Sequence, residues 1–503
     1  MNGKNGAISA AIPVTGRRTP ALTANKRDSL SESNQGGTTG KPSLVPDMSR
    51  RHVGRREFFL FCLPTFLREQ TMEVSGKMTR IQIPRGTQDI MPGTVELWQY
   101  VEARARDLSR RYNYQEIRTP LFESTELFQR GVGETTDIVE KEMYSVSNPR
   151  SDDALTLRPE GTAGVVRAYV EHKLYGQPNQ PVKVYYLGPM FRHERPQAGR
   201  YRQFVQFGVE AIGSSDPAID AEVIALAMRF YQEMGLTGLS VELNSVGTLE
   251  DRARHREHLL AHLNGVRSEL CADCQSRIDR NPLRVLDCKN EKCRTLTKDA
   301  PSILDYLSDE SAAHFEAVKG YLSALNIPYT VNPRLVRGLD YYTLTAFEIK
   351  MAEIGAVETL CGGGRYNGLV AELGGEDMPG IGFALSIERL LLALAKQGVQ
   401  LPVSGGIDCF VAIQTPDAKQ EAFILVDELR RAGVSADLDY LDRKMKAQFK
   451  QADRLGAAYT AIIGEAELAN GTVVLKEMAT GEQQEVKRDQ VAAVLAERLA
   501  ARA

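Results

Sequence analysis

Three arginines far apart in the chain, Arg192, Arg337 and Arg389, each lie among residues that could build a binding site. Arg192 lies in FRHERP, Arg337 opens RGLDYY, and Arg389 lies in GIGFALSIERL, a glycine-rich turn leading into a predicted helix. Guanidinium groups bind phosphate in bidentate fashion, and attack of a carboxylate on the α-phosphorus of ATP develops negative charge that fixed arginines stabilise. Each arginine alone is explained by a surface ion pair; only the three contexts together predict an adenylate-forming site.

The stretch from Tyr185 to Gly213 predicts two strands joined by a basic turn. Because side chains alternate along a strand, Arg192 and Glu194 share one face of the first strand, and Gln206 and Glu210 share one face of the second. The opposite face of the second strand is apolar, with Val205, Phe207, Val209 and Ala211, and the turn adds Arg195, Arg200 and Arg202. This pattern predicts a sheet with an apolar back and a ligand-binding front; a hairpin with a solvated polar face is the alternative.

Four cysteines, Cys271, Cys274, Cys288 and Cys293, form a C-x2-C-x13-C-x4-C array. This spacing is that of a candidate zinc site, and reduced, buried thiols are the alternative. The chain has seven cysteines, an odd number that does not form a disulfide framework and that indicates a reducing cytoplasm.

The elements that must position these residues follow from the apolar periodicity. A helix is predicted at Val95–Tyr112 and a short strand at Tyr114–Pro120. Further strands at 183–194, 202–213, 238–244 and 341–350, with helices at 217–235 and 383–396, predict an antiparallel sheet in an α+β fold. The charged, cysteine-bearing segment of about 247–331 is predicted to be a helical insertion.

The two ends of the chain differ from this central part. Residues 1–78 are small, polar and basic without periodicity, which predicts disorder. An over-extended start, with Met72 or Met78 as the true one, is favoured over a targeting signal. After a linker at 401–406, apolar segments at 408–413, 459–464 and 472–477 alternate with predicted helices at 416–432, 444–456 and 488–501, which indicates a separate α/β domain.

Length and composition set outer limits. A chain of 503 residues should divide into two to four domains. A net charge of −3 gives no bulk attraction to nucleic acid, so any such partner must be bound by local basic patches. The longest apolar run, Phe58–Leu67, contains Pro64 and is too short to cross a bilayer, so no membrane anchor is expected.

The arginine contexts resemble the motifs of class II aminoacyl-tRNA synthetases, and in detail those of the histidyl-tRNA synthetase family, from about Thr79 to the C-terminus. The helix and strand ending at Pro120 are similar to motif 1, a dimer-interface element, while FRHERPQAGRYRQF resembles motif 2 and GIGFALSIERLL resembles motif 3. LVRGLDYYTLTAFE at 335–348 and GGGRYNGL at 362–369 resemble two signatures peculiar to the histidyl enzymes. The resemblance implies a class II catalytic domain at 79–400, an antiparallel β-sheet flanked by helices, and an α/β anticodon-binding domain at 406–503.

The resemblance also implies a role for each site residue. Arg192 and Arg337 would be catalytic, and Arg192, Glu194 and Arg389 would bind ATP, with Mg²⁺ neutralising the pyrophosphate. The residues implied to bind histidine are Glu160, Gln206, Glu210, Tyr342 and Tyr366. An acidic group suits an α-ammonium and polar groups suit both imidazole nitrogens, although core packing is the alternative for the tyrosines. The family implies no metal held by the chain itself on which activity depends.

The tRNA would be contacted at two places. Arg195, Gln197 and Arg200 would lie near its acceptor end. In the C-terminal domain, DRKMKAQFKQADRLG places Arg443, Lys444, Lys446 and Lys450 on a predicted helix, a basic surface suited to RNA. A solvated helix face is the alternative for that charge run.

The implied activity is formation of histidyl-adenylate and pyrophosphate from L-histidine and ATP, then transfer of histidine to the 3′ end of tRNA(His), by a cytoplasmic homodimer. A non-catalytic regulatory subunit of ATP phosphoribosyltransferase is the alternative from a different functional class, and a synthetase for another amino acid is a third. The three arginines and the C-terminal domain favour the ligase over the regulator, and RGLDYY with GGGRYNGL disfavours another amino acid.

Overall fold

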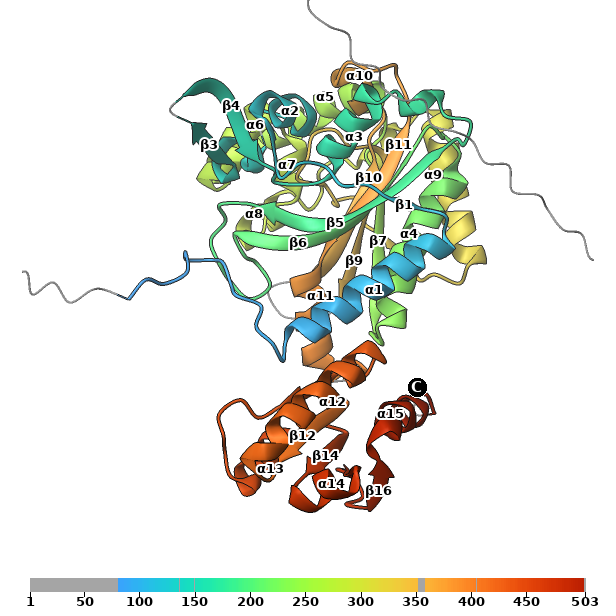
Figure 1. Ribbon diagram of the computed structural model, residues 1–503. Coiled ribbons are helices and arrows are strands. Elements are labelled where there is room, and N and C mark those ends of the chain that lie inside the picture. Colours follow the sequence, from blue (N-terminus) through green and yellow to red (C-terminus); the bar gives the residue numbers. More distant parts are fainter. Residues whose placement is uncertain (1–79, 135, 149, 352–357, 404, 502–503) are drawn as a thin grey trace, which may run out of the picture. The chain divides into compact units, whose positions relative to one another are not determined.

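The computed structural model describes residues 80–134, 136–148, 150–351, 358–403 and 405–501 (Figure 1). The extension predicted at 1–78 lies outside these residues. The largest element is an eight-stranded sheet in the order β1-β5-β6-β11-β10-β9-β7-β8. The strands are β1 (Gln115–Glu116), β5 (Val182–Phe191), β6 (Gln203–Ile212), β11 (Gly380–Ser386), β10 (Thr359–Arg365), β9 (Thr343–Met351), β7 (Leu239–Ser245) and β8 (Tyr329–Val331). The sheet is antiparallel except at its two edges, where β1 pairs with β5 and β8 with β7 in parallel.

One face of this sheet forms the main hydrophobic core with four helices. These are α1 (Val95–Arg111), α4 (Pro217–Glu233), α9 (Asp309–Ala324) and α11 (Ile387–Gln397). Phe207, Val209 and Ala211 of β6 are fully buried in this core, as their alternation with Gln206 and Glu210 predicts. The antiparallel sheet with an apolar back is therefore confirmed.

The other face carries the smaller elements. Of these, α3 (Thr162–Glu171) and α10 (Leu369–Glu372) pack on the large sheet. The helix α2 (Thr125–Val132) packs on α3 and against a three-stranded sheet of β2 (Phe122–Ser124), β4 (Ser151–Leu157) and β3 (Tyr144–Asn148). Val165, Val166 and Tyr169 of α3 pack on Val184 and Tyr186 of β5. The face is thus covered at one end by α3, which leaves the polar positions of β6, β10 and β11 available to a site.

The predicted helix at 383–396 is wrong at its start. Phe383–Ser386 belong to β11, which pairs with β6 on one side and β10 on the other, and the helix begins at Ile387. The Ser386 side chain accepts a hydrogen bond from the Arg389 backbone and caps the helix. A short apolar run fits a strand as well as a helix, so periodicity alone misplaced this boundary.

The predicted insertion of 247–331 divides in two. The helices α5 (Leu249–Val266), α6 (Ala272–Arg280), α7 (Leu283–Leu286) and α8 (Glu291–Leu296) enclose a small core of their own. In contrast, Phe315, Val318 and Leu322 of α9 pack in the main core, and β8 pairs with β7. Residues 309–331 are therefore built into the large sheet and its helical layer.

The C-terminal residues form a second, five-stranded sheet in the order β13-β12-β14-β15-β16. Its strands are β12 (Cys409–Ile413), β13 (Ala436–Leu438), β14 (Tyr459–Ile463), β15 (Thr472–Glu477) and β16 (Gln483–Lys487), and its helices are α12 (Lys419–Arg431), α13 (Met445–Arg454), α14 (Glu465–Asn470) and α15 (Val491–Ala500). The α/β character predicted for this part is confirmed. Among the described residues, no helix combines the length and apolar character that a membrane crossing requires.

Candidate functional site

A cavity of about 910 Å³ lies over the polar face of the large sheet. Its lining includes most of the predicted site residues: Glu160, Arg192, Glu194, Arg200, Gln206, Glu210, Arg337, Tyr342, Tyr366 and Arg389. Arg195 and Gln197 do not line it; both are exposed in the turn between β5 and β6. The three arginines that are far apart in the sequence are thus brought together around one cavity.

Glycines on the cavity face of β10 and β11 give the site its depth. A Cβ atom at Gly382 would lie 1.9 Å from the Glu210 carboxylate, and one at Gly380 would lie 2.2 Å from the Tyr366 ring. A Cβ atom at Gly362 would lie 2.1 Å from the Arg337 guanidinium. The glycine backbone therefore forms a floor on which charged and aromatic side chains can lie flat.

Two buried carboxylates form the acidic end of the cavity. Glu160 accepts hydrogen bonds from the Thr162 and Ala163 backbone amides at 2.8 and 2.7 Å, at the first turn of α3. Glu210, with no exposed surface, accepts from the Thr162 hydroxyl at 2.8 Å and the Tyr366 hydroxyl at 2.7 Å. Burial, reinforced by the charge of Glu160, raises the pKa of Glu210 to about 8. Burial also raises the pKa of Glu160. A cation bound beside these two groups would stabilise their charged, carboxylate form.

Polar and aromatic groups surround this acidic end. The Gln206 Oε1 atom is buried and has no hydrogen-bond partner among the described residues. Tyr342 packs against Tyr341 with ring centroids 4.7 Å apart, and Tyr341 packs edge-on against Tyr366. A buried acceptor without a partner costs free energy, so Gln206 is a position where a ligand N–H would be stabilised.

The basic end of the cavity is formed by Arg192, Arg200 and Arg389. The Arg192 Nε atom donates to the Pro159 carbonyl at 2.7 Å, and Arg389 donates to the Thr359 carbonyl at 3.0 Å. Arg200 donates to Glu194 at 3.0 Å. Burial, together with repulsion from Arg200 and Arg192, lowers the pKa of Arg389 to about 10. Glu194 partly offsets this concentration of positive charge, and an anionic ligand would relieve the remaining repulsion between the arginines.

Arg337 lies between the two ends. It forms a close ion pair with Glu348 of β9, whose other carboxylate oxygen accepts from the Thr359 hydroxyl at 2.9 Å. Burial opposes the charge of Arg337, but Glu348 and Tyr342 outweigh that effect, so the pKa of Arg337 is raised. Arg337 lines the cavity, and its Nε atom is buried without a hydrogen-bond partner among the described residues.

Sequence reasoning missed several residues of this site. Thr162 lies two residues after Glu160, and Glu348 ends the stretch LVRGLDYYTLTAFE, but no pattern signals that they contact Glu210 and Arg337. Arg284 and Arg334 also line the cavity; Arg284 belongs to the helical insertion and Arg334 to the segment before Arg337. Only the fold brings these segments together.

Arg365, within GGGRYNGL, does not line the cavity. It is fully buried and forms an ion pair with Asp220 of α4 at 2.6 Å on the opposite face of the sheet. The same carboxylate accepts from the Thr345 hydroxyl at 2.6 Å. This buried pair fastens β9 and β10 to α4 behind the site.

The basic stretch of the C-terminal sheet is only partly as predicted. Arg443 and Lys444 precede α13, which begins at Met445, and Arg443 is held by the buried carboxylate of Asp439. Lys444, Lys446 and Lys450 are exposed. The lysines, and not Arg443, are therefore the charges available to a partner.

Comparison with known proteins identifies relatives of nearly the same length as the described part of the chain. A sequence model described as "Histidyl-tRNA synthetase" matches residues 86–390, and one described as "Anticodon binding domain" matches residues 408–498. The chain is 62% identical over 420 residues to a histidine–tRNA ligase of Geobacillus sp. strain WCH70, covering 83% of this chain and 99% of the relative. It is 60% identical over 422 residues to that of Bacillus cytotoxicus, with 83% and 99% covered. A crystal structure of apo Staphylococcus aureus histidyl-tRNA synthetase superposes with a TM-score of 0.71 at 48% identity, covering 83% of this chain and all of that one.

Proposed function

The chain belongs to the histidyl-tRNA synthetase family and is a histidine–tRNA ligase that uses ATP, L-histidine and tRNA(His), and we propose that the cavity on its large sheet is where the amino acid is activated. One observation carries this proposal. A single cavity combines two buried carboxylates, Glu160 and Glu210, with three arginines, Arg192, Arg337 and Arg389. A site of this kind can hold a cationic amino acid beside a polyanionic nucleotide.

The acidic end binds L-histidine. Glu160 and Glu210 stabilise positive charge on the substrate, and the unpartnered Gln206 accepts a substrate N–H. Tyr342 and Tyr366 shape the pocket around the side chain, with the Tyr366 hydroxyl keeping Glu210 in position. An apolar side chain of similar size would leave these buried polar groups unpaired, which is a strong basis for rejecting it.

The basic end binds ATP and stabilises the transition state. A histidine carboxylate oxygen attacks the α-phosphorus as the bond to the bridging oxygen breaks, and pyrophosphate leaves. Arg192 and Arg337 stabilise the charge on the α-phosphoryl oxygens, while Arg389, with Glu194 beside it, orients the terminal phosphate and the nucleotide. Glu348 fixes the Arg337 guanidinium in place before the substrate arrives.

Mg²⁺ fits the chemistry of the cavity wall. The carboxylates of Glu194 and Glu358 line the cavity near Arg389, and carboxylate with phosphate oxygens is the ligand set that Mg²⁺ prefers. When bound, the metal would neutralise charge on the pyrophosphate leaving group.

The second half-reaction moves histidine to tRNA. A hydroxyl of the terminal ribose attacks the adenylate carbonyl carbon, and AMP leaves. Arg195 and Gln197, exposed at the turn, and Arg200, at the cavity rim, contact the acceptor end, and residues 406–503 bind the anticodon. A domain organisation of 79–400 and 406–503 supports these two tasks.

We also infer a cytoplasmic homodimer. Leu121 and Phe122, which adjoin each other next to Pro120, have exposed fractions of 45% and 53%. Apolar side chains exposed together are typical of a surface that a partner covers. Size-exclusion chromatography with light scattering tests this: a mass of about one chain at micromolar concentration would contradict the dimer.

Pyrophosphate exchange with each of the twenty amino acids, followed by aminoacylation of total tRNA, tests the proposed site. The expected result is exchange with histidine, charging of tRNA(His), and loss of exchange in Arg192→Ala and Glu210→Ala variants that remain folded. Normal histidine-dependent exchange in both variants would show that activation takes place elsewhere.

A further inference from the structure

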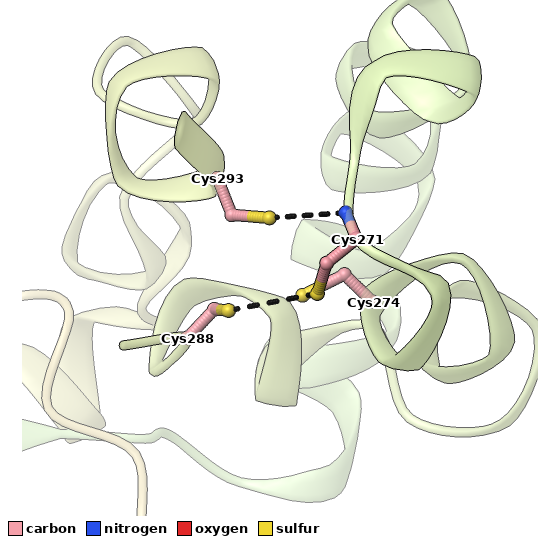
Figure 2. Close-up of side chains that lie close together, drawn as sticks. All are labelled: Cys271, Cys274, Cys288 and Cys293. Atoms are coloured by element: carbon pink, nitrogen blue, oxygen red, sulfur yellow. Dashed lines mark hydrogen bonds between the residues drawn. The ribbon is translucent and has the colours of Figure 1, made fainter. Parts of the chain in front are cut away.

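The four cysteines of the helical insertion converge on one point. Their sulfur atoms all lie within 4.8 Å of one another, and the side chains of Cys288 and Cys293 point toward those of Cys271 and Cys274 (Figure 2). Tetrahedral zinc with Zn–S bonds of about 2.3 Å requires sulfur atoms about 3.8 Å apart. The Cys271 and Cys288 sulfur atoms are 3.9 Å apart.

Three separate elements deliver these thiols. Cys271 is the N-cap of α6 and Cys274 lies in the first turn of that helix, Cys288 follows α7, and Cys293 lies in α8. The Cys271 amide donates to the Cys293 sulfur at 3.2 Å, and the Asn290 amide donates to the Cys288 sulfur at 3.4 Å. Amides that point at sulfur, and the positive end of a helix, stabilise thiolates, which is the form that binds metal.

The surroundings also suit a charged centre. Four thiolates that bind one Zn²⁺ carry a net charge of −2. Lys289 is next to Cys288 in the sequence, and Lys292 and Arg294 are on either side of Cys293, so these cations partly offset that charge. The insertion core is small: apart from Cys274 and Cys293, its buried apolar side chains are Leu259, Leu263, Leu270, Ile278, Val285 and Leu286, a size at which a metal commonly supplements packing. Cys361 and Cys409, by contrast, are single buried thiols within strands and resemble ordinary core residues.

We propose that Cys271, Cys274, Cys288 and Cys293 bind one Zn²⁺ as a closed structural site that ties α6 to α7 and α8. The site supports the cavity wall. Arg334, which lines the cavity, donates to the Leu286 carbonyl at 3.1 Å and to the Thr297 carbonyl at 2.6 Å. Leu286 lies two residues before Cys288, and the Thr297 hydroxyl donates to the Cys293 carbonyl at 2.9 Å. Removing the metal would loosen both anchor points of Arg334. This inference does not depend on the proposed residue roles in catalysis.

Elemental analysis of the purified full-length protein tests the proposal. We expect about one zinc per chain, displacement by Co²⁺ with the visible bands of tetrahedral cobalt and a thiolate charge-transfer band, and a lower melting temperature after chelation. Less than a tenth of an equivalent of zinc, in protein that also fails to take up Co²⁺, would overturn the proposal.

Variants and thiol counting separate zinc from its alternatives. Cys274→Ser and Cys293→Ser should lose at least nine-tenths of the zinc, whereas the control variants Cys361→Ser and Cys409→Ser should retain it. If Cys274→Ser and Cys293→Ser fail to fold, the zinc content and the cobalt spectrum of the wild-type protein still test whether the four cysteines bind a metal. All seven cysteines should react with a thiol reagent in denaturant containing chelator. The loss of two reactive thiols would reveal a disulfide and contradict zinc binding.

Discussion

The guanidinium of Arg337 lies against Gly362 so closely that a Cβ atom on this glycine would be 2.1 Å from one of its nitrogens. Glu348 holds the same guanidinium from the neighbouring strand, β9. The position of Arg337 is therefore determined both by a partner that attracts it and by a residue that leaves room for it.

Gly362→Ala should displace Arg337 and slow adenylation. A shift of about 1 Å in a catalytic group costs on the order of 10²-fold in rate, and the added methyl in a filled site costs about 1–3 kcal/mol of stability. Pyrophosphate exchange and thermal unfolding measure the two effects. Gly265→Ala in α5 is the matched control because its Cβ would meet nothing within 4 Å. An unchanged exchange rate in Gly362→Ala would contradict the role given to this close approach.

Arg337→Ala should lower kcat for adenylation by about 10²–10³-fold while leaving histidine binding nearly intact, because the arginine acts on charge that develops in the transition state. Calorimetric titration with histidine and single-turnover kinetics separate the two quantities. Arg337→Ala with Glu348→Gln controls for the carboxylate that the single variant leaves unpaired. Equal losses in affinity and rate would assign Arg337 to substrate binding instead.

Stability should depend on the pH through Glu210. Its folded-state pKa, about 8, lies above its ordinary value of 4.5, so the folded ligand-free protein retains a proton that the unfolded chain loses. The contribution of this group is fully present below pH 4.5 and is lost as the pH rises through 8. The free energy of unfolding should therefore fall over this window, by at most about 1.4 kcal/mol per pH unit from this one group. Glu210→Gln should flatten the profile measured by denaturant unfolding.

Histidine binding should release the proton of Glu210. A bound cation stabilises the carboxylate, so at neutral pH calorimetric titrations in buffers of different ionisation enthalpy should show proton release from the wild type and less from Glu210→Gln. The same release in both proteins would mean that another group, with Glu160 the nearest candidate, carries the proton.

Replacing Lys444, Lys446 and Lys450 with alanine should raise the KM for tRNA and reduce its salt dependence, with pyrophosphate exchange unchanged, because each lysine that contacts phosphate releases a counterion. Arg443→Ala provides a contrast: it removes the partner of buried Asp439 and should lower the melting temperature. Normal aminoacylation kinetics in the triple-lysine variant would assign these residues to a solvated surface.

The motifs could be predicted from the sequence because each is a short run of residues with a recognisable spacing. Alternation along β6 correctly separated Gln206 and Glu210 from Phe207 and Val209. Alternation predicts on which face of the sheet a side chain lies, but it does not predict how deeply that side chain is buried. The pattern predicted a ligand-binding front, but not that Glu210 would be fully buried with a raised pKa beneath Thr162 of α3 and Tyr366.

Contacts between residues far apart in the chain could not be predicted from local sequence patterns. Nothing in the spacing of Glu348 signals that it holds Arg337, or that Thr162 donates to Glu210 across the site. The helix misassigned at Phe383–Ser386 has the same origin, since only pairing with β6 and β10 makes that apolar run a strand. The four cysteine positions indicated a zinc site by spacing, but their convergence required the fold of α6 to α8.

The glycine floor under the cavity also limits how the enzyme can be redesigned. Any side chain introduced at Gly362 or Gly382 subtracts volume from the site, and none can be removed to enlarge it. Space for a bulkier amino acid must therefore come from smaller side chains at other cavity-lining positions, such as Tyr342 and Tyr366, and the glycines of the strands must be kept.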